Sequence, residues 1–335
     1  MSKEQSTILK GVAILMMLWF HLFNTSELEQ LCSPLIYIHG KALVAYLANA
    51  CYPVTFFLIF SGYGLTYLYK EGTLTVKSQS KRLLRLYIHY WVILLIFVPI
   101  GHFINPAIYP NDFQHILENI TAIKCNYNGE IWFLFPYAVI CLAAVFNVDF
   151  LYCLKGKANI ALVIVIYALL FGFMKYISVH LPENIMLNML ALQFIYYVIL
   201  MFYFSLGIIL FRVLEKGTPV SNIKPSVCTL LIVCLVIIKS MFHTTLFDGV
   251  YAFLFILLFI QLPLNSHINK VLTLLGRYSM PMWMVHTFYS YYFCKQFIYG
   301  FKYPLLIFAV LIIVSYLTAI PIMYISHQII KHCKI

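Results

Sequence analysis

The amino-acid sequence predicts an all-α membrane protein, a polytopic bundle of about ten transmembrane helices with no soluble domain. Hydrophobic residues make up 63% of the 335 residues and charged residues only 10%, against roughly 25% charged in an ordinary soluble domain. The mean hydropathy is +0.91, and apolar stretches long enough to span a bilayer recur along the chain. Because no linker, repeat or low-complexity tract interrupts them, we expect one transmembrane domain over residues 1–335, with the lipid bilayer as its surroundings.

Polar residues and Pro or Gly clusters bound the apolar stretches. The first stretch carries Trp19 and His21, and no small-residue cleavage motif follows it, so we expect a retained helix rather than a signal peptide. The ten expected spans cover residues 8–23, 50–69, 86–104, 131–148, 159–178, 190–211, 226–242, 247–263, 278–297 and 304–326.

The basic residues indicate the orientation of the chain in the membrane. The formal net charge is +11, but no basic run accompanies a nucleic-acid-binding motif, so we expect no nucleic-acid partner. With the N-terminus inside, 16 of the 22 Lys and Arg residues fall in inner segments and the other 6 in outer ones. Under the positive-inside rule this predicts a multi-pass protein of the cell membrane with both termini cytoplasmic. The nine cysteines are scattered singly, and we expect no metal site.

Two ionisable side chains lie on the first span. Lys10 and His21 are 11 residues apart, which corresponds to about 16 Å and about three helical turns, so both project from one face at different depths. Ionisable groups inside membrane helices are costly and mark functional sites. An interhelical hydrogen bond from His21 and snorkelling of Lys10 explain the same residues without catalysis, and the spacing leaves both interpretations open.

Other polar residues allow a structural and a functional interpretation as well. Ser61 belongs to a stretch of small residues, 61–64, that favours close helix packing. Arg82 and Arg85 precede the third span and share one face of the helix that leads into it, where they either set the topology or receive phosphates as guanidinium forks. Glu130 at the outer start of the fourth span is a helix N-terminal acid or a group that orients a histidine or holds a sugar.

Five short motifs, in this order, resemble acyltransferase family 3, whose members are membrane proteins that acylate sugars and other hydroxyl-bearing acceptors at the cell envelope. The resemblance extends from Lys10 to about His286. The motifs are Lys10-Gly11-Val12-Ala13-Ile14 with His21, Phe56-Phe57 with Ser61-Gly62-Tyr63, Arg82-x-x-Arg85 followed by Tyr90-Trp91, Ile131-Trp132-Phe133-Leu134, and Gly276-Arg277-Tyr278-Ser279 with His286.

The resemblance implies O-acetylation, the transfer of acetyl from cytoplasmic acetyl-CoA, or of another acyl group from its acyl-CoA, to a sugar hydroxyl of a cell-surface polysaccharide or glycan precursor. It implies no bound cofactor. His21 and Lys10 would then be the catalytic residues, with His21 either the general base for the acceptor hydroxyl or the group that first takes the acyl group. Arg82 and Arg85 would bind the donor. Supporting residues of the site would be Ser61, Glu130 and His286. Lys10 stands where most members have Arg, so the charge is kept but the planar fork is lost.

A transporter or flippase for an envelope lipid or polysaccharide precursor is the alternative from another class. In it, His21 and the arginines would line a substrate path, and substrate would move without consumption of an acyl donor. Internal pseudo-repeats are typical of such transporters, and the sequence has none that we detect. A non-catalytic scaffold would leave the costly polar groups on the spans unexplained.

Overall fold

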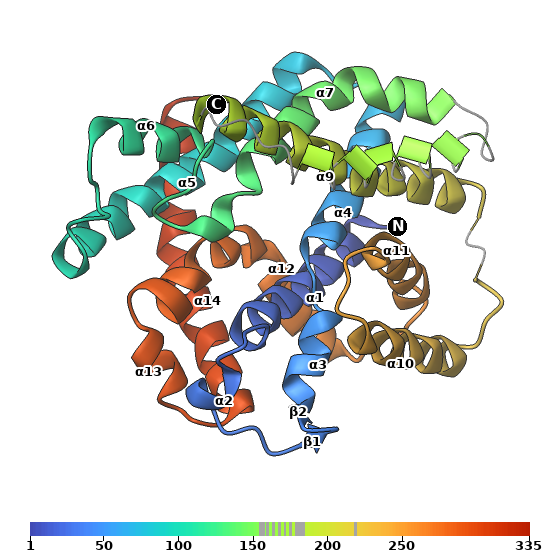
Figure 1. Cartoon of the computed structure of the whole chain (residues 1–335). Coiled ribbons are helices and arrows are strands. Elements are labelled where there is room, and N and C mark those ends of the chain that lie inside the picture. Colours follow the sequence, from blue (N-terminus) through green and yellow to red (C-terminus); the bar gives the residue numbers. More distant parts are fainter. Residues whose placement is uncertain are drawn as a thin grey trace. The chain divides into compact units, whose positions relative to one another are not determined.

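A computed structural model of the chain describes residues 1–153, 185–217 and 220–335, together with isolated stretches of one or two residues between 158 and 177. The described residues are predominantly helical (Figure 1). The strands among them are β1 (Tyr37–Ile38) and β2 (Lys41–Ala42), which pair antiparallel with Tyr37 opposite Ala42. The predicted all-α class is therefore confirmed.

Six segments of the described chain are long and apolar enough to cross a membrane. Two shorter apolar helices coincide with the expected seventh and eighth spans. The expected span at 159–178, with Lys155, Lys157 and Lys175, lies outside the continuously described residues, so the count of about ten stays a prediction. The six segments are Lys3–Phe23, Leu43–Lys70, Val76–Ile104, Gly129–Cys153, Asn188–Glu215 and Pro304–His332.

Helix starts follow recognisable capping signals. α1 (Lys3–Phe23) begins at a capping box, in which the Ser2 hydroxyl accepts the backbone N–H of Gln5 and the Gln5 side chain accepts that of Ser2. This box places the start of α1 five residues before the apolar stretch. α10 (Pro225–Met241) and α14 (Pro304–His332) begin with proline in the first turn, where its missing N–H costs no hydrogen bond.

The expected span at 278–297 is wrong at both ends. α12 (Ser266–Thr287) begins twelve residues earlier, where the Asn265 side chain accepts the backbone N–H of His267 at 2.8 Å. The polar residues of its first turns lower the hydropathy without breaking the helix. A π-helical turn, η2 (Phe288–Tyr292), then ends it, and α13 (Lys295–Tyr299) follows. Hydropathy reports contact with lipid rather than helix limits, which explains the error.

The remaining elements are the other membrane-length helices and the shorter helices between them. Most of the short ones fall in polar segments that hydropathy leaves unassigned. They are α2 (Leu28–Leu31), α3 (Leu43–Asn49), α4 (Val54–Lys70), α5 (Val76–Ile104), α6 (Phe113–Thr121), η1 (Gly129–Ile131), α7 (Leu134–Cys153), α9 (Ile185–Glu215) and α11 (Asp248–Phe259).

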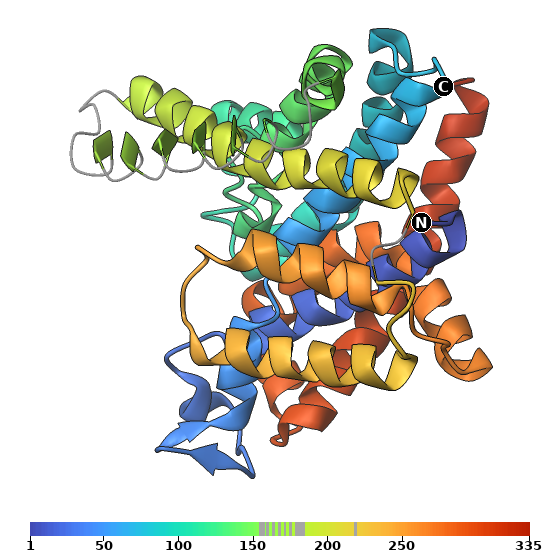
Figure 2. The same ribbon diagram turned by 90° about the vertical axis from the view of Figure 1, so that its right-hand side faces the viewer.

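The chain forms two compact units. In unit 1, α1 packs along α12, and α12 packs on α14 (Figure 1). Also in unit 1, α10 runs beside α11 (Figure 2). In unit 2, α7 packs along α9. Unit 1 comprises Met1–Phe57, Tyr87–Pro110 and Pro219–Ile335, and unit 2 comprises Leu58–Leu86 and Asn111–Thr218.

Glycines permit backbone contact between helices within each unit. In unit 1, a Cβ atom added to Gly11 of α1 would lie 2.1 Å from the Leu272 carbonyl oxygen of α12, and one added to Gly276 would lie 1.9 Å from the Thr7 oxygen. In unit 2, a Cβ on Gly62 of α4 would lie 2.0 Å from the Phe204 oxygen of α9. Glycine is therefore needed at these crossings, which supports the packing interpretation of the small residues after Ser61.

Candidate functional site

The tightly packed α1 and α12 bring two histidines together in unit 1. His21 stands in the last turn of α1, and His286 stands in the last turn of α12. Their ring centroids are 4.9 Å apart. His286 is fully buried, whereas His21 is partly exposed. The two predicted histidines therefore form one pair, although 265 residues separate them in the sequence.

Hydrogen bonding determines the tautomer of neutral His286. Its Nδ1 lies 2.7 Å from the backbone carbonyl oxygen of Trp283, and because a carbonyl can only accept, Nδ1 must carry the proton. The neutral ring then has an unprotonated Nε2. That atom is buried and has no hydrogen-bond partner within the described part of the chain. A buried unpaired nitrogen is costly for stability and is typical of a site that receives a substrate group.

Two tyrosines cap the end of α1 next to His21. The last carbonyl groups of a helix have no partner within it. The Tyr291 hydroxyl of η2 donates to the His21 carbonyl oxygen, and the Tyr299 hydroxyl of α13 donates to that of Leu22 at 3.0 Å. The π-helical turn and α13 thus hold the last turn of α1, which carries the His21 side chain. Neither tyrosine was predicted as part of the site.

Lys10 lies on α1 directly before Gly11, at the crossing with α12. Its side chain is partly buried. The glycine after it brings the two backbones together, so this part of the first motif has a packing role in addition to its charge.

A second polar cluster lies in unit 2 and contains two of the predicted residues. Arg82 of α5 donates from Nη2 to the Tyr137 hydroxyl of α7 at 3.0 Å. The same hydroxyl lies 3.0 Å from the Ser61 hydroxyl of α4. This contact uses one of the five N–H donors of the Arg82 guanidinium. Arg82 and Arg85 are both exposed, whereas Ser61 is buried. The structure thus brings Ser61 and Arg82 together through Tyr137.

Glu130 lies in η1, immediately before α7. The backbone N–H of Glu130 donates to the Asn128 side chain at 3.2 Å. The carboxylate belongs to the first turn of this short helix, where the helix dipole favours an acid, and it is partly exposed.

One comparison with known proteins identifies the family. The family model described as an acyltransferase domain, acyltransferase family 3, matches residues 5–324, nearly the whole chain. The chain belongs to acyltransferase family 3. No curated protein and no solved structure matches it. The matched range includes every predicted site residue, from Lys10 to His286.

As a member of acyltransferase family 3 with several membrane-length helices, the protein is a membrane acyltransferase. Tyr137 is the residue of the unit 2 cluster that sequence reasoning missed. It lies five residues after Trp132 of the fourth motif, on α7. With 26 tyrosines in the chain, no signal set it apart until the fold brought it to Arg82.

This acyltransferase also contains a buried ion pair that sequence reasoning missed. Lys239 of α10 and Asp248 of α11 are 6% and 2% exposed, and their charged atoms are 3.0 Å apart. The Lys239 ammonium also donates to the Asn49 carbonyl oxygen at 2.7 Å. The sequence placed Lys239 at an outer helix end, and the structure places it in the last turn of α10, where it joins α3, α10 and α11. A lysine shortly before an acidic helix start was the available signal.

Proposed function

We propose that this membrane acyltransferase transfers acetyl from cytoplasmic acetyl-CoA to a sugar hydroxyl of a cell-surface polysaccharide or glycan precursor. The observation that carries the proposal is the histidine pair. The His21 ring lies 4.9 Å from that of His286, whose buried Nε2 has no hydrogen-bond partner within the described residues and is available to a substrate group. Membership of an acyltransferase family supplies the reaction class.

The proposed reaction needs one base and a good leaving group. An unprotonated imidazole nitrogen of the pair accepts the proton of the acceptor hydroxyl while the hydroxyl oxygen attacks the thioester carbonyl carbon. The carbon–sulfur bond then breaks, and the CoA thiolate leaves with that proton as the free thiol. The products are the acetyl ester and CoA. We assign the base to His21, because it belongs to the first motif and is the more exposed member, and a supporting role to His286.

The donor carries phosphates, and the arginines of α5 suit them. A guanidinium presents several N–H donors in a plane and binds phosphate oxygens in a bidentate manner. The Tyr137 hydroxyl holds the Arg82 side chain, so less side-chain freedom is lost on binding. We propose that Arg82 and Arg85 bind acetyl-CoA as a substrate, with no bound cofactor required. The 16 to 6 distribution of basic residues supports cytoplasmic termini in the cell membrane.

Two measurements test this function. Mass spectrometry of envelope glycans from cells with and without the protein should show an acetyl ester that depends on it, and identical glycans would contradict the proposal. Acetyl-CoA binding to purified protein should weaken by about tenfold or more in Arg82→Ala with Arg85→Ala, because each charge-assisted contact contributes about 1.5–3 kcal/mol. Lys81→Ala is the matched control, since Lys81 is an exposed basic residue of the same helix. Equal acetyl-CoA affinities of the double variant and the control would exclude donor binding by the arginines and leave them a role in setting membrane topology.

A further inference from the structure

A large cavity lies in unit 2, outside both clusters described above. Its volume is about 1200 Å³. It is lined by α6, by the connection from α6 to η1, by the residues before α7 and by the first turns of α9. The volume exceeds the roughly 300–1,000 Å³ of ordinary small-molecule sites. The cavity therefore has room for a ligand of several rings.

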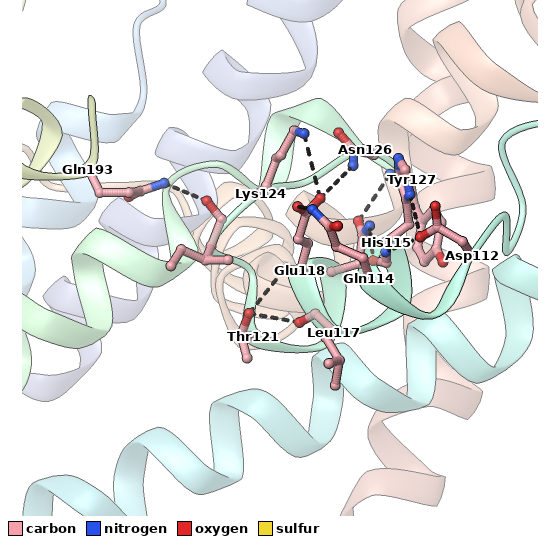
Figure 3. A network of polar contacts seen from close by, with 12 residues as sticks. Asp112, Gln114, His115, Leu117, Glu118, Thr121, Lys124, Asn126, Tyr127 and Gln193 are labelled. Atoms are coloured by element: carbon pink, nitrogen blue, oxygen red, sulfur yellow. Dashed lines mark hydrogen bonds and ion pairs between the residues drawn. The ribbon is translucent and has the colours of Figure 1, made fainter. Parts of the chain in front are cut away.

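Amide and aromatic side chains line this cavity. Gln114, Asn188 and Gln193 contribute amides, and Trp132 and Tyr196 contribute two rings whose centroids are 4.8 Å apart. The Gln193 amide donates to the Ile123 carbonyl oxygen at 2.7 Å, as Figure 3 shows. The side-chain oxygens of Asn188 and Gln193 are buried and lack a hydrogen-bond partner within the described ranges. Such unsatisfied oxygens are typical of sites completed by a ligand.

The charges at the cavity favour a neutral ligand. The Glu118 carboxylate accepts from Gln114 at 2.8 Å and from Asn126 at 3.1 Å. The Lys124 ammonium lies 3.6 Å from the same carboxylate (Figure 3). The one acid and the one base among the lining residues are therefore paired with each other. A phosphate or carboxylate ligand would have to displace Glu118 from Lys124.

We propose that this cavity binds saccharide units of the acceptor. Amides both donate and accept, as sugar hydroxyls do, and aromatic rings offer flat apolar faces to sugar rings. This proposal rests on the proposed function, in which the acceptor is a glycan. It adds a defined binding place for the glycan chain, with Trp132, Tyr196 and Gln193 as its main contacts. Apolar lining residues also make a lipid tail a competitor.

Binding of neutral oligosaccharides to the purified full chain in phosphatidylcholine nanodiscs tests the proposal. The probes are fluorescently labelled oligosaccharides of two to six hexose or N-acetylhexosamine units. At least one should bind, and Trp132→Ala and Gln193→Ala should each weaken it by about tenfold, corresponding to one lost principal contact. Leu190→Ala is the matched control, because Leu190 is an exposed residue of α9 outside the cavity lining, and it should leave the affinity unchanged.

Gln114→Ala provides a second variant on the separate helix α6, in case Trp132→Ala does not fold. Failure of every oligosaccharide to bind, or equal binding by all cavity variants, would overturn the proposal. The proposal would also be overturned if a short-chain lipid displaced the oligosaccharide and if Leu190→Ala and Gln193→Ala changed oligosaccharide affinity to the same extent. Binding is measured without transfer and should persist in His21→Ala. Acyl transfer near the wild-type level in His21→Ala, with oligosaccharide binding intact, would therefore count against the catalytic assignment alone.

Discussion

Alanine at the crossing of α1 and α12 should separate the histidine pair. A Cβ atom at Gly276 would lie 1.9 Å from the Thr7 carbonyl oxygen, and ordinary contact begins at 3.4 Å, so the shortfall is 3.4 − 1.9 = 1.5 Å. The obstacle is the backbone of α1, which cannot rotate away as a side chain could. The helices must therefore move apart by about 1 Å or more, an overpacking that costs about 1–3 kcal/mol.

Two opposing effects set the expected size of the change. Alanine is favoured over glycine in a helix by about 0.5–1 kcal/mol, so the net loss of stability for Gly276→Ala should lie between about 0 and 2.5 kcal/mol. Catalysis should suffer more, because a misplacement of about 1 Å can cost about 100-fold in rate. Gly11→Ala should behave alike, since its Cβ would lie 2.1 Å from the Leu272 oxygen.

Acyl transfer in membranes matched for protein level, together with the thermal unfolding midpoint in detergent, measures both effects. Gly64→Ala is the matched control, because among the described residues nothing beyond its own helix backbone and chain neighbours lies within 4 Å of a Cβ added there. It should keep its activity and unfold at the same or a slightly higher temperature. Wild-type transfer by Gly276→Ala would refute the dependence of the site on this helix crossing.

Three further predictions concern the buried ion pair, a cysteine and the orientation. Asp248→Asn should destabilise the protein by about 3–5 kcal/mol, since it leaves the Lys239 charge buried and unpaired. The double variant Asp248→Leu with Lys239→Met should recover much of the lost stability, measured as the thermal unfolding midpoint. A double variant no more stable than Asp248→Asn would argue against the ion pair. Burial raises the pKa of the Cys125 thiol to about 12, so the thiolate fraction at pH 7 falls below that of an ordinary thiol by about 10³-fold. Maleimide labelling of a variant with Cys125 alone should therefore be slow and accelerate as the pH rises, whereas fast labelling at pH 7 would contradict the burial. Impermeant maleimide on intact cells should label Asn111→Cys but label Lys3→Cys and Lys334→Cys only after permeabilisation; the reverse pattern would invert the orientation.

Long apolar helices could be predicted from the sequence, because each carries its own hydropathy signal. The first expected span ends where α1 ends, at Phe23, and the last expected span begins where α14 begins, at Pro304. The start of α12 was missed, since its first turns are polar and capped by Asn265. α6 was missed as well, because it is short and lies in a polar segment between spans.

The candidate site could be predicted as residues but not as an arrangement. His21 and His286 were both singled out, yet their 4.9 Å ring separation depends on the glycine crossing of α1 and α12. Tyr137 and Tyr291 contribute through contacts between distant segments, and nothing in their local sequence marks them among 26 tyrosines. Tertiary contacts of common residue types leave no periodic signal in one sequence.

Replacement of His21 by alanine removes the proposed general base and keeps the rest of the histidine pair. The measurement is transfer of labelled acetyl from acetyl-CoA to envelope glycan in membranes matched for protein level, with the exposed His267→Ala of α12 as control. We expect His21→Ala to lower transfer by about 10²- to 10⁴-fold, His286→Ala to have a milder effect and His267→Ala to have none. Transfer near the wild-type level in His21→Ala would contradict the catalytic assignment.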